Sequence, residues 1–402
     1  MTAPVNIAVI KYWGKRDTKL ILPTNSSLSL TLDQDSLNSN TTVVASKDFE
    51  QDQFFLNGKE INISDSKRMV AVISQMRANA QACVFTTASD SKSTEEVKIS
   101  SEEWSQYKLK FVSHNNFPTA AGLASSASGG AALAYALATL FHTANGPEPY
   151  PGWLSAMARQ GSGSACRSVY GGFVEWIAGD KADGTDSVAV ERFSNQHWPE
   201  MRCVVLVVHA GEKKVGSTAG MQNTVQSSAL FPQRLEIVPQ RVTDMNTAIR
   251  NRDFPAFGTL TMKDSNNFHS CCLDTFPPIV YMTDTSHHIV ELVHAFNKAH
   301  GEIVACYTYD AGPNAVLYTL DSHFATLLDL CENYFPNANI DDNMNLRQAA
   351  IETRANAETV QAQASHVETI KGTHPVQQSA TVNRMIVTKV GDGPRVLKRQ
   401  VV

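Results

Sequence analysis

Residues 115–130 are NNFPTAAGLASSASGG, and an alanine-rich apolar run, AALAYALATLF, follows at 131–141. The run from Ser125 onward has few helix breakers and is rich in Ala and Leu, so it predicts a helix that begins at the end of a loop of small residues. Small residues let a ligand approach the backbone closely, and the first N–H groups of a helix point the same way as the positive end of its dipole. The stretch therefore predicts a phosphate-binding loop, although a tight turn into a buried helix explains the same residues when they are considered alone.

The length and composition of the chain are those of a soluble globular enzyme. Its 402 residues leave room for two domains or lobes, and 43% of them are hydrophobic. The net charge of −5 lacks the basic excess of a general nucleic-acid-binding protein. No apolar run reaches the ~18 residues of a transmembrane helix, and the amino terminus lacks the basic-then-apolar order of a signal peptide. We therefore expect neither a nucleic acid nor a membrane as a partner.

The seven cysteines and twelve histidines show no disulfide or metal-binding pattern. The cysteines are scattered without a C-x-x-C pair, and the histidines form no H-E-x-x-H motif. An odd number of cysteines without a framework is typical of reduced thiols in a cytoplasmic protein. We expect a cytoplasmic enzyme and no metal that is held by protein ligands alone.

Short β-like runs alternate with helical segments, which predicts an α+β fold in two lobes with a cleft between them. The first lobe is expected to span residues 1–200. A hairpin is expected between 41–46 and 54–61, with Asn57-Gly58 as its turn. The other expected elements are strands at 6–10, 27–32 and 107–117, helices at 64–82, from 125 onward and near 151–160, and an exposed loop at 87–106.

The second lobe is expected to span residues 201–402. CVVLVVHA (203–210) is a continuous apolar, β-branched run, which indicates a buried strand. A polar arm is expected at about 336–380, because that stretch is rich in Ala, Gln and Asn. The remaining expected elements are helices at 216–230, 233–251, 253–263 and 284–300, two strands around a Gly-Pro turn within 304–320, and a final strand at 384–390.

Three further clusters carry charged groups among small residues. They are NIAVIKYWGKRD (6–17) with Lys11 and Lys15, GSGSACRS (161–168) with Arg167, and YDAGPNA (309–315) with Asp310. Each has a bland explanation by itself: solvated lysines, a flexible turn and a turn-capping carboxylate. Together with the 115–130 loop they predict a phosphoryl-transfer site, because lysines and the planar fork of an arginine suit multiply charged anions. The sequence motifs of P-loop NTPases and protein kinases are absent.

The loop PTAAGLASSA (118–127) resembles the phosphate loop of the GHMP kinase superfamily. Five further stretches resemble motifs of one branch, the diphosphomevalonate decarboxylases, in the same order along some three-quarters of the chain. They are NIAVIKYWGKR (6–16), LPTNSS (22–27), GSGSACRS (161–168), DSNNFH (264–269) and DAGPNA (310–315). Ala124 stands where the superfamily has a glycine, as is usual in this branch. The likeness is weakest after about residue 335.

The resemblance implies a GHMP-kinase-like fold with a ferredoxin-like carboxy-terminal lobe. The implied activity is ATP-dependent decarboxylation of mevalonate 5-diphosphate to isopentenyl diphosphate, with release of ADP, phosphate and CO2. This reaction belongs to the mevalonate pathway of isoprenoid and sterol biosynthesis. The implied cofactors are ATP and Mg2+, and the implied assembly is a homodimer.

The resemblance also implies roles for individual residues. Asp310 would lie at the tertiary hydroxyl as a base or orienting group, with Lys11 beside it to stabilise developing charge. Ser126 would lie nearest the transferring phosphoryl group and Mg2+, and Asn6 and Arg167 would hold the substrate carboxylate. The other implied substrate-binding residues are Tyr12, Trp13, Gly14, Lys15, Arg68, Ser162, Gly163, Ser164, Ala165, Cys166 and Thr218. The implied ATP-binding residues are Pro118, Ala121, Gly122, Leu123, Ala124, Ser125, Ser126 and Ala127.

Two other classes of protein remain as alternatives. One is a small-alcohol kinase of the same fold that stops at phosphorylation, and the Asp310 turn and the Lys11–Lys15 stretch argue against it. The other is a catalytically silent ligand sensor, which we would expect to have lost a catalytic group. Lys11, Ser126, Arg167 and Asp310 are all present.

Overall fold

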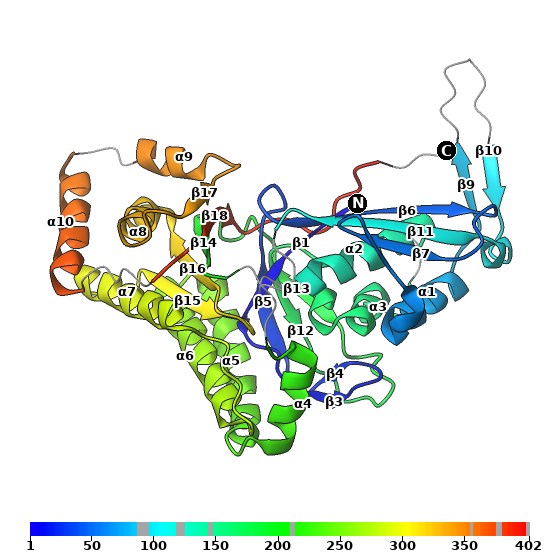
Figure 1. The fold of residues 1–402 in the computed structure, drawn as a ribbon, viewed down its shortest axis with the longest axis horizontal. Helices are drawn as coiled ribbons and strands as arrows, with labels where there is room; N and C mark the ends of the chain where they lie inside the picture. The colour runs from blue at the N-terminus through cyan, green and yellow to red at the C-terminus, as the bar shows by residue number, and fades with distance from the viewer. Residues whose placement is uncertain are drawn as a thin grey trace.

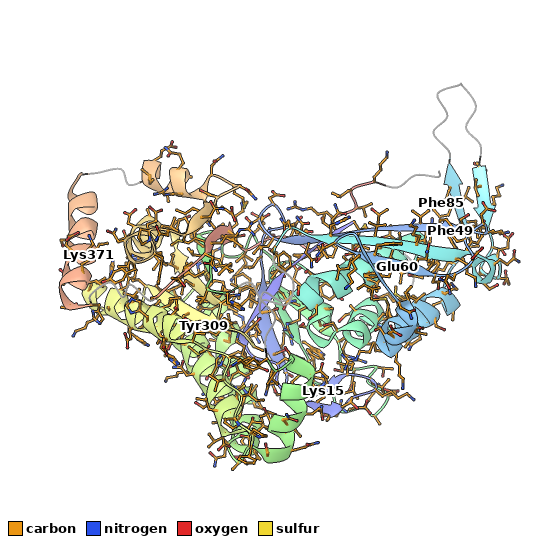
Figure 2. All side chains as sticks on the ribbon, in the orientation of Figure 1. Lys15, Phe49, Glu60, Phe85, Tyr309 and Lys371 are labelled. Atoms are coloured by element: carbon orange, nitrogen blue, oxygen red, sulfur yellow. The ribbon has the colours of Figure 1, made fainter. Side chains whose placement is uncertain are left out.

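The computed structural model describes residues 1–86, 96–117, 125–143, 148–209, 214–353, 357–374 and 380–398. Its described part is elongated (Figure 1), with the strands and helices of the amino-terminal half toward one end and those of the carboxy-terminal half toward the other. Figure 2 labels Phe85 in the first half and Lys371 in the second, at opposite ends of the molecule. The chain thus forms two bodies that meet near the middle.

Two sheets build the amino-terminal half, with the strand orders β1-β6-β11-β7-β8 and β13-β12-β5-β2. The first contains β1 (Thr2–Pro4), β6 (Asn38–Ser46), β7 (Gln53–Leu56), β8 (Lys59–Ile61) and β11 (Lys108–Asn115). The second contains β2 (Asn6–Ile10), β5 (Ser27–Thr31), β12 (Phe173–Trp176) and β13 (Ala189–Phe193). Two smaller ribbons are β3 (Lys15–Asp17) with β4 (Leu22–Pro23), and β9 (Cys83–Thr86) with β10 (Glu96–Ile99).

The alanine-rich helix predicted from the sequence is α2 (Ser125–Leu140). Its alanines lie in the core with almost no exposed surface, and it packs against β6, α3 and the short 3-10 helix Gly163–Cys166. Gly130 lets this 3-10 helix come close, because a Cβ atom there would lie 3.0 Å from the Cβ of Ala165. The other helices of this half are α1 (Lys67–Ala78) and α3 (Trp153–Gly161), with 3-10 turns at Ile63–Asp65 and Glu103–Gln106.

A third sheet, of order β15-β16-β14-β18-β17, forms the core of the carboxy-terminal half. The apolar run predicted as a buried strand is β14 (Met201–Val207), which pairs antiparallel with both β16 and β18. The order of β15, β16, β14 and β18 is that of a ferredoxin-like sheet. The other strands are β15 (Ala305–Tyr309), β16 (Ala315–Leu320), β17 (Asn339–Asp341) and β18 (Arg384–Lys389).

Some helices of this half lie against the third sheet, one packs on other helices at the outer end, and some contact strands of the first half (Figure 1). They are α4 (Ser217–Ser227), α5 (Phe231–Asn251), α6 (Phe254–Asp274), α7 (Asp284–His300), α8 (Asp321–Tyr334), α9 (Leu346–Thr353) and α10 (Ala357–Thr373). Helix α6 packs against β15 on one side and β2 on the other, so it joins the two halves. The mixed helices and sheets confirm the α+β fold.

Two local predictions in the amino-terminal half were wrong. The turn at Asn57-Gly58 is present, but it joins β7 to β8, whereas β6 pairs with β1 and β11. The long strand β11 pairs antiparallel with β6 and parallel with β7, so it separates the two segments expected to form one hairpin. Glu96–Ile99, within the stretch expected to be an exposed loop, is the strand β10.

The carboxy terminus returns to the amino-terminal half. Leu32 bridges Val390, Thr2 bridges Arg395, and the backbone of Gly171 lies against Asp392 and Gly393. The last described residues therefore pack on the first sheets of the chain. Among the described helices, none combines the length and apolar character needed to cross a bilayer.

Candidate active site

A cavity of about 170 Å³ is lined by residues from both halves of the chain. It contains four basic side chains and one carboxylate, so its lining is strongly cationic. Figure 2 labels Lys15 on the amino-terminal side and Tyr309, the residue before Asp310, at the end of β15. The lining residues are Asn6, Ala8, Lys11, Tyr12, Trp13, Lys15, Arg68, Ser125, Ser126, Ser162, Gly163, Ser164, Arg167, Ser217, Thr218, Met221, Phe268, Asp310 and Ala311.

Lys11 and Asp310 form an ion pair across the junction of the two halves. The Nζ atom of Lys11 lies 2.6 Å from Oδ1 of Asp310. Lys11 follows β2 and is 3% exposed, whereas Asp310 follows β15 and is 26% exposed. Burial lowers the pKa of Lys11 from its usual range, while the contact with Asp310 raises it. The pair places a cation and a carboxylate, a candidate proton acceptor, at one point of the cavity wall.

Arg167 is buried and is held by neutral groups. Its Nε atom donates to Ser29 Oγ at 3.0 Å and to Asn6 Oδ1 at 3.2 Å, and its Nη1 atom donates to Ser27 Oγ at 2.7 Å. No carboxylate of a described residue pairs with it, and its Nη2 atom donates to no described residue. A buried guanidinium with no carboxylate of a described residue within ion-pair distance is a ready binding group for an anion in the cavity.

Asn6 orients the 3-10 helix that carries Arg167. Its Nδ2 atom donates to the carbonyl oxygen of Ser164 at 3.0 Å and to Ser168 Oγ at 2.7 Å. Ser162, Gly163 and Ser164 then line the cavity directly. Because Asn6 is on β2, one strand fixes both the Lys11 and the Arg167 sides of the site.

Two further cations lie on the same cavity wall. Lys15 begins β3 and Arg68 is in the first turn of α1. Burial, and to a smaller extent the nearby positive charge of Arg68, lower the pKa of Lys15 to about 8. Two neighbouring cations that disfavour each other are suited to an anion with more than one charge.

Tyr12 and Trp13 give this wall its shape. The ring of Tyr12 lies 4.6 Å from that of Trp176, and burial raises the pKa of its phenol, so the hydroxyl stays protonated. The Nε1 atom of Trp13 donates to Thr224 Oγ1 at 3.0 Å, which anchors α4 beside the cavity. Helix α4 contributes Ser217, Thr218 and Met221 to the lining.

The start of α2 is the described part of the predicted ATP site. Ser125 and Ser126 line the cavity, and Ser126 is exposed in the first turn of the helix. Ala127 is buried and does not line the cavity. Pro118, Ala121, Gly122, Leu123 and Ala124 lie outside the described residues.

Three predicted substrate-binding residues are not on the cavity wall. Ala165 and Cys166 lie within the 3-10 helix and are buried, and burial raises the pKa of the Cys166 thiol to about 12. Gly14 has a φ of +88°, and a Cβ atom there would lie 2.6 Å from the ring of Phe231. These residues shape the backbone next to the cavity and do not face it.

The sequence interpretation missed several residues of the site. Ser27 and Ser29 hold Arg167, and their alternation in the strand SLSLT is a signal that both point to one face. The lining residues that were missed are Ala8, Ser217, Met221, Phe268 and Ala311. They carry small or apolar side chains, for which the sequence offers no chemical signal.

Comparisons with known proteins agree with this geometry. Residues 3–189 match the family described as "Diphosphomevalonate decarboxylase-like N-terminal domain", and residues 203–397 match "Mevalonate 5-diphosphate decarboxylase C-terminal domain". The diphosphomevalonate decarboxylase of Bos taurus is 48% identical over 397 residues, which cover 98% of this chain and 92% of that protein.

Solved structures give the same result. A crystal structure of a mevalonate 5-diphosphate decarboxylase superposes with a TM-score of 0.79 at 41% identity, covering 100% of this chain and 97% of that chain. A structure described as MDDEF in complex with MVAPP, AMPPCP and magnesium has a TM-score of 0.69 at 34% identity, covering 83% and 92% of the two chains. From its full-length likeness in sequence and fold, the chain belongs to the diphosphomevalonate decarboxylase family.

Proposed function

We propose that this chain catalyses the ATP-dependent decarboxylation of mevalonate 5-diphosphate. The products are isopentenyl diphosphate, ADP, phosphate and CO2. The observation that carries this proposal is the cavity itself, where four cations surround a single Lys11–Asp310 pair. The substrate carries a carboxylate, a diphosphate and a tertiary alcohol, and the cavity offers a group suited to each.

The chemistry explains why a decarboxylase needs a phosphoryl-transfer fold. Direct loss of CO2 would leave an electron pair on a carbon atom with nothing to stabilise it. If the tertiary hydroxyl first receives the γ-phosphoryl group of ATP, it becomes a good leaving group. The electrons of the breaking C–CO2 bond then form the C=C bond as the phosphate departs with the electrons of the C–O bond. No external oxidant or reductant is needed.

Asp310 and Lys11 are assigned to the tertiary hydroxyl. Asp310 accepts its proton, or a hydrogen bond that aims its oxygen at the phosphoryl group. Lys11, 2.6 Å from Asp310, stabilises the negative charge that develops on the oxygen atoms nearby. Both residues stand at the ends of strands, where the sheets hold their backbones.

The other cations are assigned to the two anionic ends of the substrate. Arg167, oriented by Asn6, binds the carboxylate and aligns the C–C bond that must break. Lys15 and Arg68 bind the diphosphate, together with the groups of the neighbouring walls, namely Tyr12, Trp13, Ser162, Gly163, Ser164 and Thr218. Gly14, Ala165 and Cys166 contribute by setting the course of the backbone beside these groups.

ATP and Mg2+ fit the described start of α2. Ser125 and Ser126, the first two residues of this 16-residue helix, line the cavity, and the start of a helix favours the binding of an anion. Ser126 is assigned to the Mg2+ that accompanies ATP and to the transferring phosphoryl group, with Ser125 and Ala127 beside it. When bound, Mg2+ neutralises charge on the phosphates. The structure of MDDEF with AMPPCP, an ATP analogue, and magnesium supports ATP and Mg2+ as the cofactors.

We place the enzyme in isoprenoid and sterol biosynthesis in the cytoplasm, as a homodimer of two-domain subunits divided near residue 200. Seven free, buried cysteines support a reducing compartment. Sedimentation of the purified protein would test the homodimer.

The test of the reaction is a product balance. The purified protein is mixed with mevalonate 5-diphosphate, ATP and Mg2+, and ADP, inorganic phosphate and CO2 are followed together. The proposal predicts equal amounts of the three. A small-alcohol kinase would form ADP and a stable phosphorylated product, without phosphate or CO2, and a ligand sensor would form none of them.

A further inference from the structure

A buried cluster of charges lies behind Lys11 and does not line the cavity. Its acidic member is Asp264 on α6, and its basic members are Arg234 and Arg241 on α5. Arg234 and Asp264 are both 0% exposed, and two hydrogen bonds of 2.9 and 3.0 Å join them. Arg241 donates to the same carboxylate at 3.0 Å. Burial alone would raise the pKa of Asp264, but the arginines hold it below its usual range.

This cluster holds the main chain of Lys11 on both sides. The N–H group of Lys11 donates to Asp264 Oδ2 at 2.7 Å, from a residue 253 positions away. The carbonyl oxygen of Lys11 accepts from Arg234 Nη2 at 3.1 Å and from Asn25 Nδ2 at 3.0 Å. Lys11 lies just beyond the end of β2, so these contacts take the place of a strand ladder.

Stability alone does not account for this arrangement. Two fully buried charges lose much of their solvation energy, and apolar residues of similar volume often stabilise a protein as well as a buried ion pair does. The contacts are also specific: a carboxylate, a guanidinium and an amide converge on the backbone N–H and C=O groups of one residue. The ammonium group of that residue, Lys11, meets Asp310.

We propose that Asp264, supported by Arg234 and Arg241, is a positioning residue for the reaction, because it fixes the backbone of Lys11 so that the ammonium group meets Asp310. The proposal rests on the function proposed above. Asp264 is not among the residues that line the cavity, and it acts through its hydrogen bond to Lys11. Its negative charge also raises the pKa of Lys11 against the effect of burial.

The test is a double-mutant cycle on kcat. Asp264→Asn keeps the size of the side chain and removes its charge. In the wild-type background it lowers kcat about tenfold to a hundredfold, the range for a misplaced catalytic group, and the Kd of AMPPCP stays unchanged. In a Lys11→Met background the same substitution lowers kcat no further, because the group that it positions is already absent. The alkaline limb of the kcat profile of Asp264→Asn moves to lower pH.

A second, less disruptive variant tests the inference if Asp264→Asn does not fold. Arg241 is 16% exposed, so Arg241→Gln weakens the cluster without leaving Arg234 unpaired. It is expected to lower kcat in the same Lys11-dependent way, by a smaller factor. The matched control is Arg202→Gln. Arg202 is 14% exposed, lies in the same half of the chain, and forms an ion pair with Asp321 that the substitution removes. The control leaves kcat unchanged.

The outcomes separate this inference from the proposed function. Equal losses of kcat in the wild-type and Lys11→Met backgrounds would show that Asp264 does not act through Lys11. The same would follow if Arg202→Gln lowered kcat as much as Arg241→Gln. If the wild-type protein releases no CO2, the proposed function is wrong and the inference falls with it. If the wild-type protein is active, only the inference is at stake.

Discussion

Lys11 and Asp310 are 299 positions apart in the sequence, yet the Nζ atom of one lies 2.6 Å from Oδ1 of the other. The first follows a strand of the amino-terminal half and the second follows a strand of the carboxy-terminal half. Helix α6 packs against both strands and carries Asp264, whose carboxylate accepts a hydrogen bond from the backbone N–H of Lys11. The reactive centre therefore depends on the junction of the two halves.

Replacing Asp310 by Asn tests its role at the tertiary hydroxyl. The variant keeps the size of the side chain and loses the charge, so substrate and nucleotide binding are expected to remain. The turnover number falls at least ~10²-fold, the low end of the effect of a general base. Steady-state assays give kcat, and circular dichroism confirms the fold. Near-normal turnover in a folded variant would remove Asp310 from the mechanism.

Catalytic efficiency is expected to depend on both the charge and the shape of the side chain at position 167. Arg167→Gln loses a charged hydrogen bond to the substrate carboxylate, worth about 1.5–3 kcal/mol, so kcat/KM falls about tenfold to a hundredfold. Arg167→Lys keeps the charge but cannot reach Ser27, Ser29 and the substrate with one ammonium group, so it is also impaired.

Nucleotide binding is the control for the Arg167 variants. The proposed function assigns the phosphates of ATP to the start of α2, so the Kd of AMPPCP is expected to be unchanged in both variants. Titration of AMPPCP and of mevalonate 5-diphosphate against each variant distinguishes the two ligands. Weakened nucleotide binding with normal substrate binding would show that Arg167 binds the nucleotide and that its assignment to the substrate carboxylate is wrong.

Lys15 predicts a specific pH dependence. Burial lowers its pKa to about 8, so the free enzyme carries this charge below pH 8 and loses it as the pH rises above 8. The profile of kcat/KM for mevalonate 5-diphosphate should therefore fall above about pH 8, by about tenfold per pH unit. In Lys15→Arg the guanidinium stays charged, and this limb should disappear. If the fall in kcat/KM above pH 8 is unchanged in Lys15→Arg, then a group other than Lys15 causes it.

Gly14 is expected to matter for stability. Its φ of +88° disfavours any other residue, and a Cβ atom would lie 2.6 Å from the Phe231 ring and 2.8 Å from Thr24 Oγ1. Gly14→Ala should lower the free energy of unfolding by about 2–4 kcal/mol, from the backbone strain and the overpacking together. Gly58→Ala is the matched control, because Gly58 has a φ of +81° with open space around it. This substitution should lower the free energy of unfolding by about 1 kcal/mol. Urea unfolding measures both, and equal losses would rule out the contact with Phe231 as a cause.

Local patterns predicted most elements but not how distant segments pair. The helix expected at 284–300 is α7, and the strand expected at 6–10 is β2, because the first has a helical periodicity and the second is a short, mainly apolar run. The predicted pairing of β6 was wrong. It pairs with β11, a segment distant in sequence, and not with the next strand along the chain. The stretch DSNNFH (264–269) stood out in the sequence, but the role of Asp264 could not be predicted, because its contact with Lys11 spans 253 positions.

The most direct test of the account uses mevalonate 5-diphosphate labelled in its carboxylate. Labelled CO2 and ADP are counted in the same reaction, with the wild-type protein and with Asp310→Asn. The account predicts one labelled CO2 for each ADP in the wild type, and the loss of both products together in the variant. ADP formed by the wild type without labelled CO2 would contradict the account, since the cavity would then belong to a kinase.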